Sequence, residues 1–277
     1  MAADNTRSVV VGRGIAHVVL VALAILSLAP FAWMVLASFK ELSEVENLNP
    51  WPSRWVPQNY ATVFQKVPFA KYYFNSVFIA GWVTFLTVVT SSMAAFAFAR
   101  LKWPGRDMIF RMYLATMMIP GVVTMIPNYN LMVQLHFLDS YQGLIIPGAF
   151  SAFGTFMLRQ FMMSIHPALD EAAELDGAKP WRVFWDVIMP LAKPGTVTLG
   201  IFTFMGSYGS FFWPLILTKS TYLRTLPIGM LFFDGINGRE TNLIMAGSVM
   251  NIIPLIILFV VSQKFLVQGI QLGAVKG

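Results

Sequence analysis

The chain is built of long apolar runs separated by polar segments. Six of these runs are each about as long as the ~20 residues that cross the hydrocarbon core of a bilayer. They cover residues 15–39, 76–99, 112–133, 143–163, 195–217 and 243–263. The first run is too long for the apolar part of a secretory signal, so we expect an uncleaved anchor. The pattern predicts an all-α integral membrane protein with six transmembrane helices.

A polar segment with helical character, residues 165–194, lies between the fourth and fifth runs. Asp170 and Glu171 lie near the positive end of its first predicted helix, where negative charge is favourable. Asp176-Gly177 indicates a turn, because glycine readily takes the left-handed conformation that ends a helix. A loop that only joins two membrane helices needs few charges. This segment is therefore predicted to dock another protein.

A second helix in this segment is expected to begin at Pro180, since proline suits the first helical position. Its apolar side chains recur at i, i+3, i+4 and i+7, which predicts a single stripe. The stripe consists of Trp181, Phe184, Trp185 and Ile188. Arg182 and Asp186, four residues apart, are expected to pair on another side of the helix.

Composition supports a membrane protein independently of the runs. The chain is 57% hydrophobic and 12% charged, with a mean hydropathy of +0.65, outside the range of soluble domains. The pI of 9.6 fits basic residues at membrane flanks better than nucleic-acid binding. An N-terminus on the inner side puts most Lys and Arg there, so both termini are predicted to be cytoplasmic. The chain has no cysteine, which excludes disulfides.

The sequence lacks several residues and motifs that would indicate ion coupling, ATP binding, a metal site or catalysis. None of the six runs contains Asp or Glu. A charged side chain at mid-membrane costs ~2.5–3.5 kcal/mol, and one that persists there usually carries function, often proton or ion coupling. The absence of such residues disfavours a proton-driven carrier. No GxxxxGK[ST] motif is present, so the chain lacks a P-loop for ATP. The three histidines, His17, His136 and His166, are dispersed and suggest neither a metal site nor a catalytic triad. We expect a chain that is not an enzyme and binds no cofactor itself.

Interruptions and polar residues within the runs indicate a candidate substrate path. Pro120-Gly121 and Pro127 interrupt the third run, and Pro147-Gly148 the fourth. Broken helices are tolerated where they line a cavity, although ordinary kinks are the alternative. The fifth run combines hydroxyls with aromatic rings, which suits sugars; helix contacts and core packing are the alternatives. The candidate path comprises Asn128, Asn130, Ser207, Tyr208, Gly209 and Ser210.

The loop also carries a family resemblance. The sequence EAA at 171–173, the turn Asp176-Gly177-Ala178 and the apolar stripe ending at Pro190 resemble the coupling-loop signature of membrane subunits of binding-protein-dependent ABC importers. Residues 272–277 resemble the tail of the maltose-type carbohydrate uptake permeases, specifically the shorter of their two membrane subunits. Asn75-Ser76 and the sequence FWPL at 212–215 also match. Relatives usually carry Trp-Asn where this chain has Tyr208-Gly209, so their substrate contacts need not transfer.

The resemblance implies one half of a heteromeric pore for ATP-driven uptake of a sugar or oligosaccharide delivered by a solute-binding protein. It implies a second homologous permease subunit, two ATPase subunits that hold ATP and Mg, and an extracytoplasmic solute-binding protein. A carbohydrate substrate and membrane lipids complete the partners, and no nucleic acid is expected. The expected location is the cytoplasmic (inner) membrane of a bacterium or archaeon. The alternatives are a non-sugar solute such as a glycerophosphodiester, or a membrane scaffold or secondary-carrier subunit.

The resemblance also assigns regions and residues. Residues 1–14 are expected to be a cytoplasmic N-terminus, 15–270 the transmembrane domain with the coupling loop at 165–194, and 271–277 a cytoplasmic tail. In the tail, Gly273 and Lys276 are expected to contact the ATPase. The residues expected to couple to the ATPase are Glu171, Ala172, Ala173, Asp176, Gly177, Trp181, Arg182 and Phe184.

Overall fold

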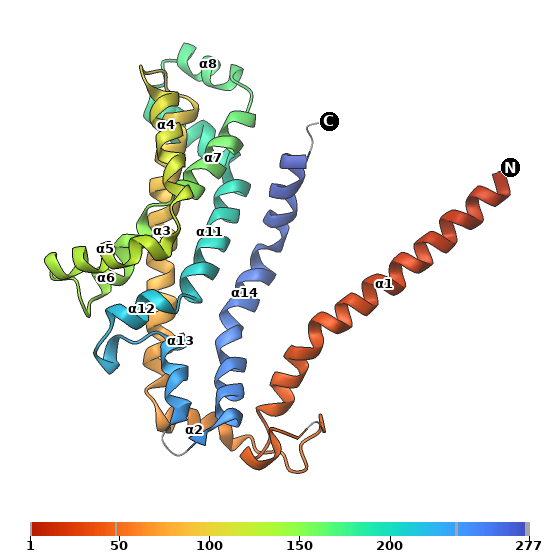
Figure 1. The fold of residues 1–277 in the computed structure, drawn as a ribbon. Helices are drawn as coiled ribbons and strands as arrows, with labels where there is room; N and C mark the ends of the chain where they lie inside the picture. Colours follow the sequence, from red (N-terminus) through yellow and green to blue (C-terminus); the bar gives the residue numbers. More distant parts are fainter. Residues whose placement is uncertain (1, 48, 236–237, 275–277) are drawn as a thin grey trace. The chain divides into compact units, whose positions relative to one another are not determined.

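The computed structural model describes residues 2–47, 49–235 and 238–274 (Figure 1). The described residues are mainly helical, as the apolar runs predict. They form two compact units, one of residues 1–68 and 230–252 and the other of residues 69–229 and 253–277. The one strand pair described lies in the first unit, where β1 Asp234–Gly235 runs antiparallel to β2 Gly238–Arg239.

The first unit is organised around a buried amide. Asn59 Nδ2 donates to the carbonyl oxygens of Ser38 and Lys40, both at 2.9 Å, and Asn59 Oδ1 accepts from Asn242 Nδ2 at 3.1 Å. A buried amide needs partners for its polar atoms, so this side chain joins the end of the first helix to the start of the last. The helices of this unit are α1 Ala2–Ala37, η1 Leu42–Glu44, α2 Gln58–Lys66, η6 Met230–Phe233 and the beginning of α14 Thr241–Ala274.

The second unit is built along one long helix, α3 Phe69–Ala99. Two helices pack against it, α7 Ala152–Ser164 and α11 Lys193–Tyr208 (Figure 1). Small residues allow the close approach. A Cβ on Gly154 would lie 2.8 Å from Ser91 Oγ and 3.0 Å from a methyl carbon of Leu199. Such contacts are typical of packed membrane helices.

A second buried amide ties together separate segments of this unit. Asn75 Nδ2 donates to the carbonyl oxygens of Tyr222 at 2.8 Å and Arg224 at 2.9 Å. The Tyr141 hydroxyl donates to Asn75 Oδ1 at 2.7 Å. The neighbouring Ser76 Oγ accepts from the Leu226 N–H at 2.7 Å. The Asn75-Ser76 pair singled out in the sequence thus fixes η5 Thr221–Leu223, α6 Tyr141–Ile145 and α13 Leu226–Gly229 to α3.

The interrupted runs are indeed broken helices. In the third run, α4 Arg106–Ala115 continues as η2 Thr116–Met118, and α5 Gly121–Gln134 follows at a bend of 98°. The bend falls at Pro120, whereas Pro127 lies inside α5. In the fourth run, η3 Ile146–Ala149 contains Pro147 and separates α6 from α7. The fifth run has a break that the sequence did not predict, because α11 ends before Gly209 and α12 Phe212–Leu217 begins three residues later.

Three helical segments are long and apolar enough to cross a membrane: Arg13–Ala37, Phe69–Ala99 and Thr241–Lys264. The number rises to five if each of two bent pairs is one span. These pairs are Arg106–Met118 with Gly121–Gln134, and Pro180–Leu191 with Lys193–Tyr208. The run at 143–163 is divided by η3 and gives no such helix in the part of the chain that is described. The count of six stays a prediction.

Candidate functional site

The first half of the coupling loop folds as the sequence predicts. Helix α8 spans Ala168–Leu175, with Asp170 and Glu171 in its first turn. It ends in a turn where the Gly177 N–H donates to Glu174 O at 3.0 Å and the Ala178 N–H donates to Ala173 O at 2.9 Å. Gly177 has the left-handed conformation expected of it, with φ of 82°. The loop therefore turns sharply at a position where a side chain would be strained.

The second half departs from a regular α-helix. It consists of α9 Pro180–Arg182, the π-helical segment η4 Val183–Ile188 and α10 Met189–Leu191. The side chains of the predicted stripe divide into two pairs by burial. Phe184 and Ile188 are buried, but Trp181 is 59% exposed and Trp185 44% exposed. A π-turn holds more residues than an α-turn, but side chains four apart stay close, as Trp181 and Trp185 do with ring centroids 5.6 Å apart. The ion pairs among the described residues do not include Arg182 with Asp186.

The residues expected to couple to an ATPase fall into two groups. Ala173 packs partly against the core of the second unit, and Phe184 lies within it, with its ring centroid 5.2 Å from that of Phe96. These two side chains fasten the loop to the bundle. The others are exposed and form the outer surface of the loop: Glu171, Ala172, Asp176, Gly177, Trp181 and Arg182.

Sequence reasoning missed two leucines on this surface. Leu175 at the end of α8 is 89% exposed, and Leu169 in its first turn is 44% exposed. A large apolar side chain that is exposed beside charged residues at a helix end is typical of a docking surface. In the sequence both leucines stand in an acidic helix whose other apolar residues are alanines. We call Leu169, Glu171, Leu175, Asp176 and Trp181 the docking face.

An ion pair attaches α8 to the end of α3. Arg100 Nη1 lies 3.2 Å from Asp170 Oδ2, and Arg100 Nη2 donates to the Ile165 carbonyl at 2.9 Å. The two side chains are 9% and 15% exposed. Burial raises the pKa of the Asp170 carboxyl above its usual value, by more than the Arg100 charge lowers it. No sequence pattern predicts this pair, because the two residues are far apart along the chain.

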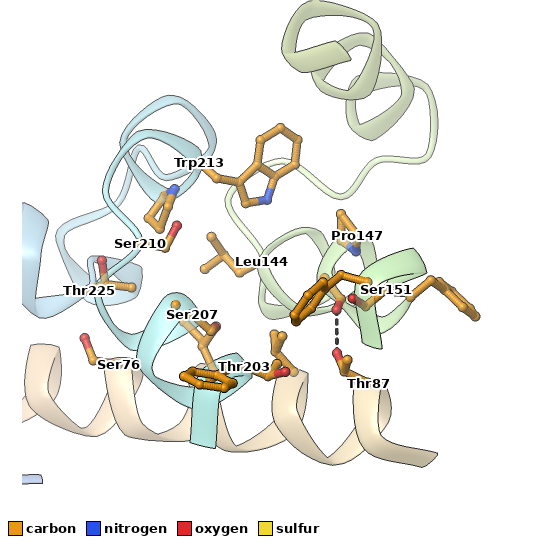
Figure 2. Close-up of a pocket in the computed structure, with 18 of the residues that line it drawn as sticks. Ser76, Thr87, Leu144, Pro147, Ser151, Thr203, Ser207, Ser210, Trp213 and Thr225 are labelled. Atoms are coloured by element: carbon orange, nitrogen blue, oxygen red, sulfur yellow. Dashed lines mark hydrogen bonds between the residues drawn. The ribbon is translucent and has the colours of Figure 1, made fainter. Parts of the chain in front are cut away.

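A pocket of about 490 Å³ lies within the second unit (Figure 2). Residues of α3, α5, α6, η3, α7, α11 and α12 contribute to its wall. Eight of the lining side chains carry hydroxyl or amide groups: Ser76, Thr87, Asn128, Ser151, Thr203, Ser207, Ser210 and Thr225. Its aromatic residues are Phe150, Phe153, Phe202 and Trp213. All residues that line it are described, and none of them is charged.

The backbone holds several of these polar side chains in place. The Thr87 hydroxyl donates to Gly148 O at 2.8 Å, and Ser151 Oγ accepts from the Gly154 N–H at 2.9 Å. The indole N–H of Trp213 donates to Gly143 O at 3.0 Å. Figure 2 shows Thr87, Ser151 and Pro147 at one end and Ser76, Ser210 and Thr225 at the other. Thr225 Oγ1 is buried and has no partner among the described residues, so it is available to a ligand or water.

The structure brings together half of the predicted substrate path. Asn128, Ser207 and Ser210 line the pocket, whereas Asn130, Tyr208 and Gly209 do not. Tyr208 is 2% exposed and stacks on Phe204 with ring centroids 5.7 Å apart. The polar residues that sequence reasoning missed as path residues come from α3, α11 and two segments outside the helices, which are far apart along the chain. They are Ser76, Thr87, Ser151, Thr203 and Thr225.

The predicted tail contacts fall at the end of the last helix. Helix α14 continues to Ala274, so Gly273 lies in its last turn. Lys276 lies outside the described residues. Within the described part of the chain, no three His, Cys, Asp or Glu side chains gather as metal ligands would.

Comparison with known proteins gives a consistent result. Residues 87–270 match the family described as the binding-protein-dependent transport system inner membrane component. The arabinooligosaccharides transport system permease protein AraQ of Bacillus subtilis is 34% identical over 260 residues, 92% of each chain. The sn-glycerol-3-phosphate transport system permease protein UgpE of Yersinia enterocolitica is 30% identical over 266 residues, 92% of this chain and 94% of that one.

A solved structure agrees with these relatives. The chain is similar to a chain of a bacterial ABC transporter involved in the import of the acidic polysaccharide alginate. The TM-score is 0.82 and the identity 25%, with 91% of this chain and 96% of that chain covered. The resemblance carried by the coupling loop is thereby confirmed at the level of the family. The chain belongs to the inner membrane components of binding-protein-dependent transport systems, the permease subunits of ABC importers.

Proposed function

We propose that this chain forms half of the transmembrane pathway of an ATP-driven importer that takes up a sugar or oligosaccharide delivered by a solute-binding protein. The observation that carries the proposal is the construction of the coupling loop. Its docking face is exposed, while Phe184 and Asp170 fasten it to the bundle. An exposed surface that is firmly attached to the helix bundle can transmit the movement of a bound partner to that bundle.

The partner at the docking face is an ATPase subunit. The loop offers carboxylates and apolar side chains side by side, a combination that suits a mixed protein interface. Two such ATPase subunits hold ATP and Mg, since this chain has no P-loop. A second, homologous permease subunit completes the pore, and an extracytoplasmic solute-binding protein delivers the solute. The family membership of the chain supports this assembly.

The chain crosses the inner membrane six times, with both termini in the cytoplasm. Contacts in the second unit agree with this topology. The proposed outer segments meet where the backbone N–H groups of Lys219 and Ser220 donate to Asp139 Oδ1 at 2.9 and 3.0 Å. The proposed inner segments meet at the Arg100–Asp170 pair. In this topology the broken fourth run spans the membrane as α6, η3 and α7 together, and the tail lies beside the coupling loop.

The pocket is the part of the pathway that contacts the solute. Its hydroxyl and amide groups match sugar hydroxyls, and aromatic faces match the C–H faces of sugar rings. The relative AraQ is named for arabinooligosaccharides and UgpE for sn-glycerol-3-phosphate. A phosphate needs a cation or several aligned donors, and none of the residues lining the pocket is charged. The pocket therefore favours an uncharged carbohydrate over the glycerophosphodiester alternative.

The proposal is tested in proteoliposomes that contain the complete complex and its binding protein. Glu171→Lys reverses a charge on the docking face and is expected to leave the chain in the membrane but to abolish solute uptake. Glu46→Lys makes the same change at an exposed site of the proposed outer side and serves as the control. Uptake at the parental rate, with normal solute-stimulated ATP hydrolysis in Glu171→Lys, would show that the loop does not couple.

The same vesicles test the solute. A neutral arabinooligosaccharide is expected to stimulate ATP hydrolysis and to accumulate, while sn-glycerol 3-phosphate does neither. Stimulation by the phosphate alone would favour the alternative solute class without affecting the coupling assignment.

A further inference from the structure

Three segments of the second unit meet at a single guanidinium. Arg100 directly follows α3, its Nη2 donates to the carbonyl of Ile165 after α7, and its Nη1 lies 3.2 Å from the carboxylate of Asp170 in α8. Helix α8 has no buried residue of its own. The side chain of Asp170, at 15% exposure, is therefore the deepest polar attachment of this helix to the bundle.

This pair is poorly suited to a purely stabilising role. Arg100 Nε and Asp170 Oδ1 are both buried and have no hydrogen-bond partner among the described residues. Burying charges costs free energy that their attraction often fails to recover, particularly when polar atoms are left unsatisfied. A more exposed pair, such as Arg106 with Asp107 at the start of α4, where the two side chains are 26% and 66% exposed, incurs less of this cost. The buried pair instead fixes the direction in which α8 is held.

Helix α3 extends from this pair to the pocket. It carries Ser76, Val83 and Thr87, all of which line the pocket. Thr87 precedes Arg100 by thirteen positions in the sequence, or about 20 Å along a helix rising ~1.5 Å per residue. A continuous helix is stiff over this length, so displacement of its inner end also moves the pocket wall.

We propose that Arg100 and Asp170 are positioning residues that transmit displacement of the docking face to α3 and thereby to the pocket. The inference rests on the proposed coupling role of the loop. A partner that presses on α8 moves Asp170, and the guanidinium carries that movement to the end of α3 and, through Ile165, to α7. Without the pair, α8 would be held by the apolar packing of Ala173, and less of its movement would reach the pocket.

The test measures the number of ATP molecules hydrolysed for each solute imported by the reconstituted complex. Asp170→Ala is expected to raise this ratio about fivefold or more, the size of a typical coupling between sites. Asp107→Ala is the matched control, because Asp107 pairs with Arg106 and Arg159 but is 66% exposed. A purely structural role would lower the yield or thermal stability of the complex and leave the ratio unchanged.

A second variant removes both charges, so that neither is left buried alone. Arg100→Cys with Asp170→Cys can be bridged by a short bis-maleimide, because the chain has no cysteine of its own. With cysteine-free partner subunits, the ratio is expected to be high before bridging and to return towards the parental value afterwards. A covalent bridge restores the mechanical connection without restoring charge.

The outcomes separate this inference from the proposed function. A parental ratio in both Asp170→Ala and the unbridged cysteine variant, with Glu171→Lys still inactive, overturns the transmission role alone. A high ratio that bridging leaves unchanged also overturns it. If Glu171→Lys transports normally, the coupling role of the whole loop is wrong.

Discussion

Gly105 and Gly177 have nearly the same backbone conformation, with φ of 81° and 82°, and a Cβ on either would meet no heavy atom within 4 Å. Alanine at each position therefore creates backbone strain without a clash, at ~1–2 kcal/mol. Gly105 precedes α4, whereas Gly177 ends α8 beside the docking face. The two sites form a matched pair for separating strain from coupling.

We expect Gly177→Ala to lower uptake severalfold by reorienting α8, and Gly105→Ala to leave uptake near the parental rate. Both variants should lower the thermal unfolding temperature of the complex by similar amounts. Uptake and unfolding are measured on the same reconstituted preparations. Equal losses of uptake at the two positions would mean that strain alone, and not the orientation of the docking face, explains the effect.

The pocket offers a second matched pair. Gly206 lines it, and a Cβ there would meet no atom within 4 Å, whereas Gly209 is outside the lining and its Cβ would meet only Met205 O at 3.3 Å. Gly206→Trp is expected to fill the pocket and abolish uptake in an intact complex. Gly209→Trp should retain uptake, contrary to the path expected from sequence. Loss of uptake in Gly209→Trp alone would favour the sequence-based path.

Asp139 takes part in a contact whose stability depends on pH. Burial alone would raise its pKa, but the N–H groups of Ser220 and Lys219, the Ser220 hydroxyl and the Lys219 charge hold the pKa below its usual value. The resulting stability is present above the unfolded-state pKa, near ~3.9, and is lost as pH falls through the lower folded-state pKa.

Asp139→Asn keeps an oxygen acceptor but removes the charge. At neutral pH this variant is expected to unfold at a lower temperature than the parent in detergent, and the difference should narrow as the pH falls below the unfolded-state pKa of ~3.9. Differential scanning fluorimetry over pH 3–7 measures it. A difference that stays constant across this range would show that geometry, not charge, is responsible.

Substitutions of Phe184 and Trp181 are expected to distinguish anchoring of the coupling loop in the bundle from docking of the partner. Phe184 is 2% exposed within the core, so Phe184→Ala is expected to destabilise the chain by ~3–5 kcal/mol, as buried phenylalanine truncations do. Trp181 is 59% exposed, so Trp181→Ala should leave unfolding nearly unchanged but reduce co-purification of the ATPase subunits. Urea unfolding and affinity pull-down measure the two effects. A large stability loss in Trp181→Ala would assign that side chain to the core instead.

The sequence predicted features that depend on a few neighbouring residues. Apolar runs indicated the long helices, Pro120 the sharp bend, and Asp176-Gly177 the turn of the coupling loop. The prediction failed where the backbone forms a π-helical turn in place of the expected α-helix. The π-helical segment at Val183–Ile188 was not predicted, because a helical period of 3.6 was assumed throughout, and it leaves Trp181 and Trp185 both exposed.

The candidate site was predictable only in part, for a different reason. The Arg100–Asp170 pair and the meeting of Ser76 with Thr225 in one pocket depend on how distant helices pack. The spacing of apolar and polar residues along the chain does not show which distant helices will pack together. Ser207 and Ser210 were found because both lie in one run, with aromatic residues beside them.

The buried amide of Asn59 also bears on how the protein is made. Its Oδ1 accepts from Asn242, 183 residues later in the chain. A ribosome delivers Asn59 to the membrane long before Asn242 exists, so the amide oxygen must be satisfied by water or by a temporary partner meanwhile. The first unit thus reaches its final form only after the beginning of the last helix has been synthesised.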